Sequence, residues 1–216
     1  MNLLMKSFSL PLLEHAPSGG PYPIPTASAH FVNGRALKGP FPAEADAALF
    51  GMGCFWGAER KFWSLPGVHV TAVGFAGGLT PNPTCKEVTS GLTGHNEVVL
   101  VIYDPKIISY LSLLKVFWEG HDPTRVVPQG DRIGTERSAI YASTPGQLAA
   151  ARASKSAYEK ALKTKGLGPI STEVVEAPEF YYAEESHQQY LARNPGHRCD
   201  DGGTGVACEV GHRVAA

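Results

Sequence analysis

Cys54 lies in a position where a thiol can act as a nucleophile. The glycine-rich stretch at 51–57 (GMGCFWG) follows an apolar run at 45–50 that predicts a buried strand. The residues after it repeat at helical spacing: Phe55, Glu59, Phe62 and Trp63. A thiol at a helix N-terminus faces unpaired N–H groups and the positive end of the helix dipole, and both favour the thiolate. A small buried cysteine that only fills the core is the alternative, but the aromatic residues at a strand-to-helix turn favour a nucleophile.

The overall composition restricts the function. The chain has 216 residues, enough for one domain with a sizeable core, and its 19 basic and 20 acidic side chains give a net charge of -1. No basic footprint for nucleic acid is present, and no apolar run approaches the roughly 20 residues that cross a bilayer. Four cysteines without metal-site spacing indicate thiol chemistry in a reducing compartment, the cytoplasm, with no metal and no membrane partner.

Residues 1–44 form an N-terminal arm that differs from the rest of the chain. The segment at 1–13 has one lysine and an apolar patch broken by Pro11, so it makes a poor secretory signal, and mitochondrial import is an alternative. Residues 17–43 are rich in Pro, Gly, Ala and Ser, and we expect an extended arm with little core of its own. The main domain is expected over 45–216, with a glycine-rich coil from about 195 as its tail.

Hydrophobic patterns predict strands that alternate with helices. Strands are expected at 45–50, 68–75, 96–103, 138–142 and 170–176. Helices are expected from 54, broken at 65–67, and then at 109–119, 144–163 and 178–193. Rigid or polar loops are expected at 80–84 and 121–137. This order indicates a sandwich of helices packed on a mixed sheet, in the α/β or α+β class.

Five short motifs occur in order along the chain. They are 53–57 (GCFWG), 74–78 (GFAGG), 93–97 (TGHNE), 137–141 (RSAIY) and 187–190 (HQQY). Together, from about residue 45 to 208, they resemble the A-type peptide methionine sulfoxide reductases. The resemblance implies an α+β, ferredoxin-like sandwich with a long C-terminal coil wrapped over it. It also implies reduction of the S epimer of methionine sulfoxide, free or in proteins, without a bound cofactor. Nothing in the sequence suggests an obligate assembly, and we expect a monomer.

The resemblance assigns roles to four residues. Cys54 would attack the sulfoxide sulfur, release methionine and be left as a sulfenic acid, the first and reversible stage of thiol oxidation. Phe55 and Trp56 would form the apolar wall that receives the substrate's methyl group. Glu97 would give a proton to the sulfoxide oxygen, which requires a carboxyl kept neutral by a partly apolar pocket. A solvated carboxylate at a strand end is the alternative for Glu97.

The two tail cysteines fit a recycling step. Cys199 and Cys208 lie nine positions apart on either side of a glycine-rich hinge. By resemblance, Cys199 would attack the Cys54 sulfenic acid, Cys208 would attack that disulfide, and thioredoxin (or dithiothreitol) would reduce the Cys199–Cys208 bond. An unremarkable pair of tail thiols is the alternative. The resemblance also puts His95 and the 187–190 motif near the site, where we expect a structural role for both.

Three positions depart from the family pattern at the expected substrate site. Cys85 stands where the family usually has a tyrosine that holds the sulfoxide oxygen. A second binding tyrosine is usual where Glu136 stands; either Glu136 takes its place or that residue is deleted, because the loop is one residue short. Asp131 is the candidate for the loop's acidic residue. Loss of a hydrogen-bond donor aimed at developing charge typically costs about 10² to 10³ in rate. We therefore expect a slower enzyme with its nucleophile intact.

Alternatives follow from these departures. If Cys85 occupies the tyrosine's place, its sulfur would lie near Cys54 and could trap the sulfenic acid directly. A protein that binds methionine sulfoxide or senses redox state, without efficient turnover, is a second interpretation. A thiol peroxidase-like scavenger is a third, because an exposed cysteine of low pKa reacts with peroxide.

Overall fold

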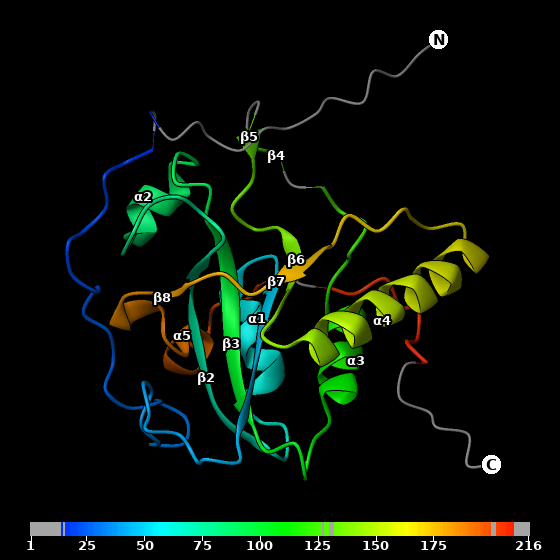
Figure 1. Cartoon of the computed structure of the whole chain (residues 1–216), viewed down its shortest axis with the longest axis horizontal. Coiled ribbons are helices and arrows are strands. Elements are labelled where there is room, and N and C mark those ends of the chain that lie inside the picture. The colour runs from blue at the N-terminus through cyan, green and yellow to red at the C-terminus, as the bar shows by residue number, and fades with distance from the viewer. Residues whose placement is uncertain (1–13, 15, 127, 130–131, 200–201, 210–216) are drawn as a thin grey trace.

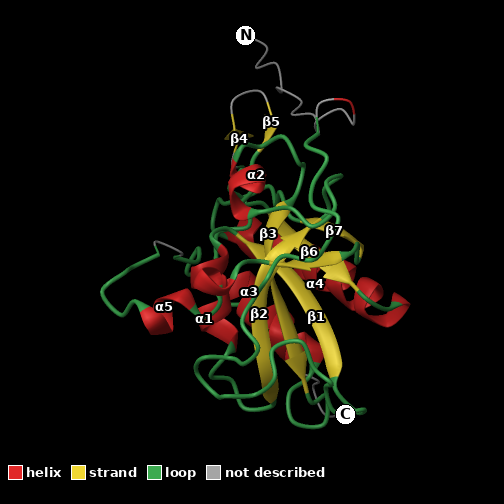
Figure 2. Ribbon diagram, turned by 90° about the vertical axis from the view of Figure 1, so that its left-hand side faces the viewer, coloured by secondary structure: helices red, strands yellow, loops and turns green. Residues whose placement is uncertain are grey.

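A six-stranded mixed sheet forms the centre of the molecule in the computed structural model, which describes residues 14, 16–126, 128–129, 132–199 and 202–209. Its order is β7-β6-β1-β3-β2-β8 (Figure 1). The strands are β1 (Asp46–Met52), β2 (Val68–Ala76), β3 (Asn96–Tyr103), β6 (Ser138–Ala142), β7 (Glu173–Glu176) and β8 (Phe180–Tyr182). The β6–β7 pair is parallel and the other neighbours are antiparallel. The twisted sheet, yellow in Figure 2, runs through the middle of the molecule.

Three helices cover one face of this sheet: α1 (Phe55–Phe62), α3 (Tyr110–Gly120) and α4 (Pro145–Thr164). The units β1-α1-β2 and β3-α3-β6 interleave to give the strand order β6-β1-β3-β2, which is the ferredoxin-like arrangement. The predicted α+β, ferredoxin-like sandwich is therefore confirmed. Thr144 caps α4 by accepting the N–H of Gln147, with Pro145 in the first turn.

The main core lies between the sheet and these helices. Phe50 of β1 stacks on Phe62 of α1 at 5.5 Å between ring centroids, and it also contacts Phe117 of α3 at 5.4 Å. Trp118 is fully buried, and its indole N–H donates to Ser154 of α4 at 2.9 Å. Burial of such aromatic side chains is the main source of stability in a domain of this size.

The N-terminal arm covers the opposite face of the sheet. Leu37 and Ala27 are buried against Val70 and Ala72 of β2. His30 is also buried, with its Nε2 atom 3.0 Å from the Thr71 hydroxyl. The described part of the arm includes a turn closed by an antiparallel bridge between Ala29 and Ala36, and the arm contributes more to the core than its composition predicts. The reason is that the apolar second face of the sheet supplies the partners that the arm itself lacks.

The predicted helix at 178–193 is wrong. The chain there forms β8, the 3₁₀ helix η2 (Glu185–His187) and the short helix α5 (Tyr190–Arg193). β8 pairs with β2 at Gly74, where a Cβ atom would lie 2.2 Å from the Tyr181 carbonyl oxygen, so only glycine permits the approach. Gln189 has φ 48°, a left-handed conformation that separates η2 from α5.

The remaining differences are small. The strand expected from 170 begins only at Glu173. A short helix α2 (Cys85–Thr89) follows the loop at 80–84, because Thr84 and Glu87 form a capping box that nucleates it. The polar loop at 121–137 contains the hairpin strands β4 (Pro128–Gln129) and β5 (Arg132–Ile133), which project beyond the sheet on the side of α2 (Figures 1 and 2).

Candidate active site

The fold places Cys54 at the N-terminus of α1, as the sequence predicts. β1 ends at Met52, and Gly53 turns the chain with φ 84°, a conformation that favours glycine. Cys54 is the N-cap residue of α1, and its carbonyl oxygen accepts the N–H of Ala58 at 3.2 Å. The thiol is half-buried at the point where the first N–H groups of the helix have no partner within it.

The pKa of the Cys54 thiol is raised, whereas the sequence predicts a lowered pKa at the helix N-terminus. Burial raises the pKa of its thiol well above the ordinary range, and the negative charges of Glu97 and ionised Cys199 raise it further. The backbone N–H groups of Trp56 and Gly57 lower the pKa, as the helix N-terminus predicts, but they do not offset the loss of solvation. Cys54 therefore rests as a neutral thiol in this structure.

Phe55 and Trp56 form an apolar surface next to this thiol. Phe55 is buried and packs on Phe75 of β2 at 5.7 Å between ring centroids. Trp56 is half-buried and stacks on Tyr190, with the rings 3.9 Å apart and 14° from parallel. The two predicted wall residues therefore lie together, and both are held by further aromatic side chains.

Glu97 lies at the start of β3, beside the N-terminus of α1. Its Oε2 atom accepts the backbone N–H of Phe55 at 3.1 Å. Its own backbone N–H donates to the carbonyl oxygen of Thr135 at 2.7 Å, which brings the loop at 134–137 next to the site. The structure thus brings the Glu97 carboxyl next to the N-terminus of α1, within electrostatic reach of the Cys54 thiol.

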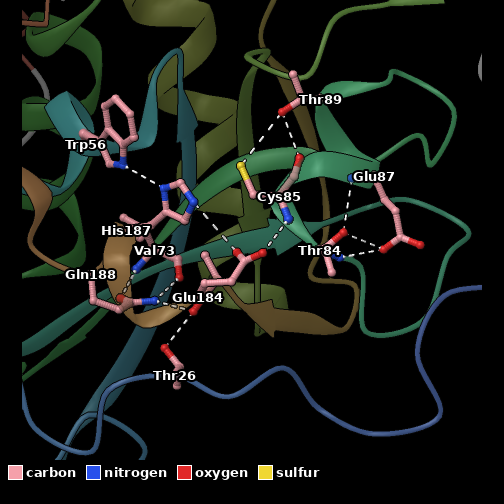
Figure 3. A network of polar contacts seen from close by, with 11 residues as sticks. Thr26, Trp56, Val73, Thr84, Cys85, Glu87, Thr89, Glu184, His187 and Gln188 are labelled. Atoms are coloured by element: carbon pink, nitrogen blue, oxygen red, sulfur yellow. Dashed lines mark hydrogen bonds and ion pairs between the residues drawn. The ribbon is translucent and has the colours of Figure 1, made fainter.

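Cys85 lies at the edge of the same apolar cluster. Its side chain packs against the group that contains Phe55, and its backbone N–H donates to Glu184 Oε1 at 2.9 Å (Figure 3). Burial raises the pKa of its thiol, and the negative charges of Glu184 and Glu97 add to this effect. Of the other two departures, Glu136 is exposed, and Asp131 lies outside the described residues.

The tail brings one of its two cysteines to the nucleophile. The sulfur atoms of Cys54 and Cys199 are 3.7 Å apart. Cys208 instead is buried in the core against α3, where its N–H donates to Glu119 at 2.7 Å and its carbonyl oxygen accepts from Lys115 at 3.0 Å. All four cysteines are reduced thiols in this structure. Cys208 must therefore leave its buried position before it can act in a relay.

Two carboxyl groups near the site, those of Glu59 and Glu184, were not predicted from the sequence. Glu59 of α1 is fully buried, and it accepts hydrogen bonds from Thr71 and from both the backbone and side-chain nitrogen atoms of Gln189. Burial raises the pKa of Glu59 to about 7. The sequence signal was available, because an acidic residue on the apolar face of a helix indicates a buried hydrogen-bond network. No comparable sequence pattern marks Glu184, whose Oε1 accepts the backbone N–H of Cys85.

The two histidines of the motifs have structural contacts. His95 accepts the N–H of Gly78 through Nδ1 at 3.1 Å, and its Nε2 donates to the carbonyl oxygen of Thr80 at 2.7 Å. This confirms the expected structural role at the turn before β3. His187 contacts Trp56 directly, with Trp56 Nε1 donating to His187 Nδ1 at 3.3 Å (Figure 3).

Within the described residues, no group of three or more His, Cys, Asp or Glu side chains is arranged to hold a metal ion. No helix in that part of the chain combines the length and the apolar composition needed to cross a membrane.

Known proteins share both the sequence and the fold. The family model described as peptide methionine sulfoxide reductase matches residues 46–205. Peptide methionine sulfoxide reductase MsrA of Rippkaea orientalis is 57% identical over 210 residues, covering 97% of each chain. The MsrA 1 protein of Caulobacter vibrioides is 56% identical, covering 96% of each chain. Among solved structures, methionine sulfoxide reductase A of Corynebacterium diphtheriae matches with a TM-score of 0.80 and 43% identity, over 94% of this chain and 99% of that one. The chain therefore belongs to the peptide methionine sulfoxide reductase family and is of the A type.

Proposed function

We propose that this methionine sulfoxide reductase acts on the S epimer, free or in proteins, with Cys54 as the nucleophile. The observation that carries the proposal is the position of the Cys54 thiol: at the N-terminus of α1, beside Glu97 and 3.7 Å from Cys199. A nucleophile, a carboxyl and a second thiol are the groups that reduction of a sulfoxide by thiols requires.

The first step transfers the sulfoxide oxygen to Cys54. The Glu97 carboxylate takes the proton of the neutral Cys54 thiol and passes it to the sulfoxide oxygen while the Cys54 sulfur attacks the sulfoxide sulfur, which this protonation makes more electrophilic. The S–O bond of the substrate breaks, methionine leaves, and Cys54 becomes a sulfenic acid. Cys54 loses the two electrons that the substrate gains. Phe55 and Trp56 hold the methyl group and keep water away from the reacting atoms.

The second step regenerates Cys54. The Cys199 thiol attacks the sulfenic acid, which forms the Cys54–Cys199 disulfide and releases water. Cys208 then attacks the Cys199 sulfur, so that Cys54 leaves as a thiol and a Cys199–Cys208 disulfide remains. Thioredoxin, or dithiothreitol in the laboratory, reduces this last bond, and no cofactor is bound. Gly202, Gly203 and Gly205 lie between the two cysteines and give the tail the freedom that the exchange needs.

The substrate's oxygen has fewer donors here than in a typical family member. Cys85 and the exposed Glu136 stand at the positions of two tyrosines, and Asp131 is the remaining candidate in that loop. We expect kcat to be lowered by about 10² or more, in the range that loss of such donors produces. Glu97 is then the main group that stabilises negative charge on the sulfoxide oxygen, by giving it a proton.

The proposed chemistry fits the reducing conditions of the cytoplasm, because the three thiols of the cycle must return to the reduced state after each turnover. We propose a monomer that acts on methionine sulfoxide and thioredoxin, and not on nucleic acid or membranes.

Reduction of the separate S and R epimers tests the proposal. Wild type, Cys54→Ser and the distant control His69→Gln are compared with dithiothreitol and then with thioredoxin. We expect S-selective turnover in wild type and the control, none in Cys54→Ser, and dependence on thioredoxin when it is the sole reductant. Equal reduction of both epimers would contradict the proposal. Absence of turnover in folded wild type would favour the binding or redox-sensing alternative.

A further inference from the structure

Trp56 is held on two sides by the motif at 187–190. Its ring stacks face to face on Tyr190 at 3.9 Å. Its ring is also nearly parallel to that of His187, with an interplanar angle of 16° and the centroids 5.7 Å apart, and the indole N–H donates to His187 Nδ1 at 3.3 Å. The first and last residues of the motif therefore fix the plane and the rotation of the indole.

The two glutamines of the motif fix the segment itself. Gln188 completes the hydrogen-bond ladder of β2, with its side-chain oxygen accepting the N–H of Val73 at 3.0 Å and its nitrogen donating to the Val73 carbonyl at 2.8 Å (Figure 3). Gln189 is bonded to the buried Glu59 through its backbone and its side chain at 2.9 and 2.7 Å. His187 and Tyr190 are consequently mounted on a segment that is tied to the sheet and to α1.

The hydrogen bond from Trp56 selects one form of His187. Nδ1 accepts this hydrogen bond and so carries no proton of its own, which leaves the neutral ring with its proton on Nε2. That nitrogen lies 3.9 Å from Glu184 Oε2, while Glu184 Oε1 accepts the backbone N–H of Cys85 at 2.9 Å (Figure 3). Burial lowers the pKa of His187 and so favours the neutral ring, although the charge of Glu184 opposes this. A continuous chain of contacts thus runs from the indole of Trp56 to the N-terminus of α2.

We propose that His187 is a positioning residue: by accepting the Trp56 indole N–H at Nδ1, it sets the orientation of the indole and thereby the fit of the substrate's methyl group. This rests on the proposed function, in which Trp56 is part of the methyl-binding wall. His187 also contacts the other wall residue, Phe55, with ring centroids 5.6 Å apart, so in this scheme it acts through the wall and not on the reacting sulfur. Its loss should therefore raise KM more than it lowers kcat, because binding of the methyl group depends on it and the Cys54 chemistry does not.

Two substitutions of similar size separate the acceptor from the ring. In His187→Asn, the amide oxygen can take the place of Nδ1 and accept from Trp56. In His187→Gln, the longer side chain moves the amide to the place of Nε2, so the contact with Glu184 remains and the acceptor for Trp56 is lost. His69→Gln is the matched control, because His69 lies on β2 among arm residues, with its ring against Phe41. Circular dichroism and thermal unfolding confirm that each variant is folded.

The decisive readouts are steady-state kinetics with S-methionine sulfoxide and the indole N–H signal of Trp56 in ¹⁵N-labelled protein, assigned with Trp56→Phe. We expect His187→Gln to raise KM about tenfold with kcat changed less than about threefold, as loss of one partner from a half-buried hydrogen bond predicts. The indole signal should shift in His187→Gln and return toward the wild-type position in His187→Asn.

An unshifted indole signal in His187→Gln would overturn the inference, as would a His187→Asn variant no better than His187→Gln in both readouts. Failure of the proposed function is distinguishable from this result. If wild type does not reduce the sulfoxide at all, the kinetic comparison is lost, but the indole signal still decides whether His187 orients Trp56.

Discussion

The sulfur atoms of Cys54 and Cys199 lie 3.7 Å apart, although 145 positions separate the two residues in the chain. A disulfide requires about 2.05 Å, so formation of the bond needs only a small approach of the tail toward α1. The described tail is thus already placed for the first thiol exchange. Cys208, in contrast, is buried against α3.

The first oxidised product should therefore contain a Cys54–Cys199 disulfide. Treatment of Cys208→Ser with one equivalent of S-methionine sulfoxide, followed by alkylation and peptide mapping, should show this bond as the main product. Cys85 competes for the sulfenic acid only if its sulfur reaches Cys54. A dominant Cys54–Cys85 bridge would contradict the predicted order of exchange.

Cys54 should react slowly with iodoacetamide at neutral pH, because burial and the charge of Glu97 raise the pKa of its thiol. The alkylation rate should continue to rise as the pH increases beyond the ordinary pKa of a cysteine thiol. In Glu97→Gln the profile should move to lower pH, since the raising effect of the carboxylate is removed. Mass spectrometry of the Cys54 peptide measures the rate, and an unmoved profile in Glu97→Gln would show that Glu97 does not act on this thiol.

Cys208 should be protected from alkylation by its contacts with Glu119 and Lys115. The Glu119 carboxylate accepts the N–H of Cys208 at 2.7 Å and pairs with Lys115 at 2.8 Å, and Lys115 donates to the Cys208 carbonyl. Loss of one such charge-assisted bond should increase local opening by roughly tenfold. Alkylation of Cys208 in Glu119→Ala should be faster by this factor, with Cys85 as the internal control. Equal Cys208 rates in both proteins would mean that other contacts hold the tail.

His121 should make the protein less stable in mild acid. It is buried, with Nδ1 donating to the carbonyl oxygen of Phe117 at 2.8 Å and Nε2 accepting from the Ser138 hydroxyl at 2.7 Å, and burial lowers its pKa from 6.5 to about 4. Between these two pH values His121 is protonated in the unfolded chain and neutral in the folded protein. The free energy of unfolding should fall from pH 6.5 to pH 4, by at most about 3 kcal/mol from this residue.

Urea unfolding of wild type and His121→Asn at pH 7 and pH 4.5 measures this contribution. The variant should start from a lower stability but lose less of it on acidification. Parallel losses in both proteins would show that His121 is not the group responsible.

Most of the fold could be predicted from local patterns. The strands at 96–103 and 138–142 and the helix that follows Thr144 are marked by β-branched runs, caps and Pro at the first turn, all of which act within a few residues. The segment at 178–193 could not be predicted, because β8 forms only through pairing with β2 at Gly74. That contact is remote in sequence and overrides the helical pattern.

The candidate site could be predicted in its members but not in its electrostatics. The motifs identify Cys54, Phe55, Trp56 and Glu97, and the structure brings them together. The sequence predicts a thiolate from the helix N-terminus, yet burial of the thiol has the larger effect and the opposite sign. Desolvation depends on side chains from several elements, so local sequence does not contain it.

The number of methionine molecules formed without reductant tests the central claim most directly. Wild type, Cys208→Ser and Cys54→Ser are each mixed with excess S-methionine sulfoxide, and methionine is counted per chain. If Cys54 reduces the sulfoxide and passes its oxidation to Cys199 and then Cys208, wild type should form about two equivalents, because the second exchange restores the Cys54 thiol. Cys208→Ser should form about one equivalent and Cys54→Ser none. Methionine formation by Cys54→Ser, or none by wild type, would contradict the account.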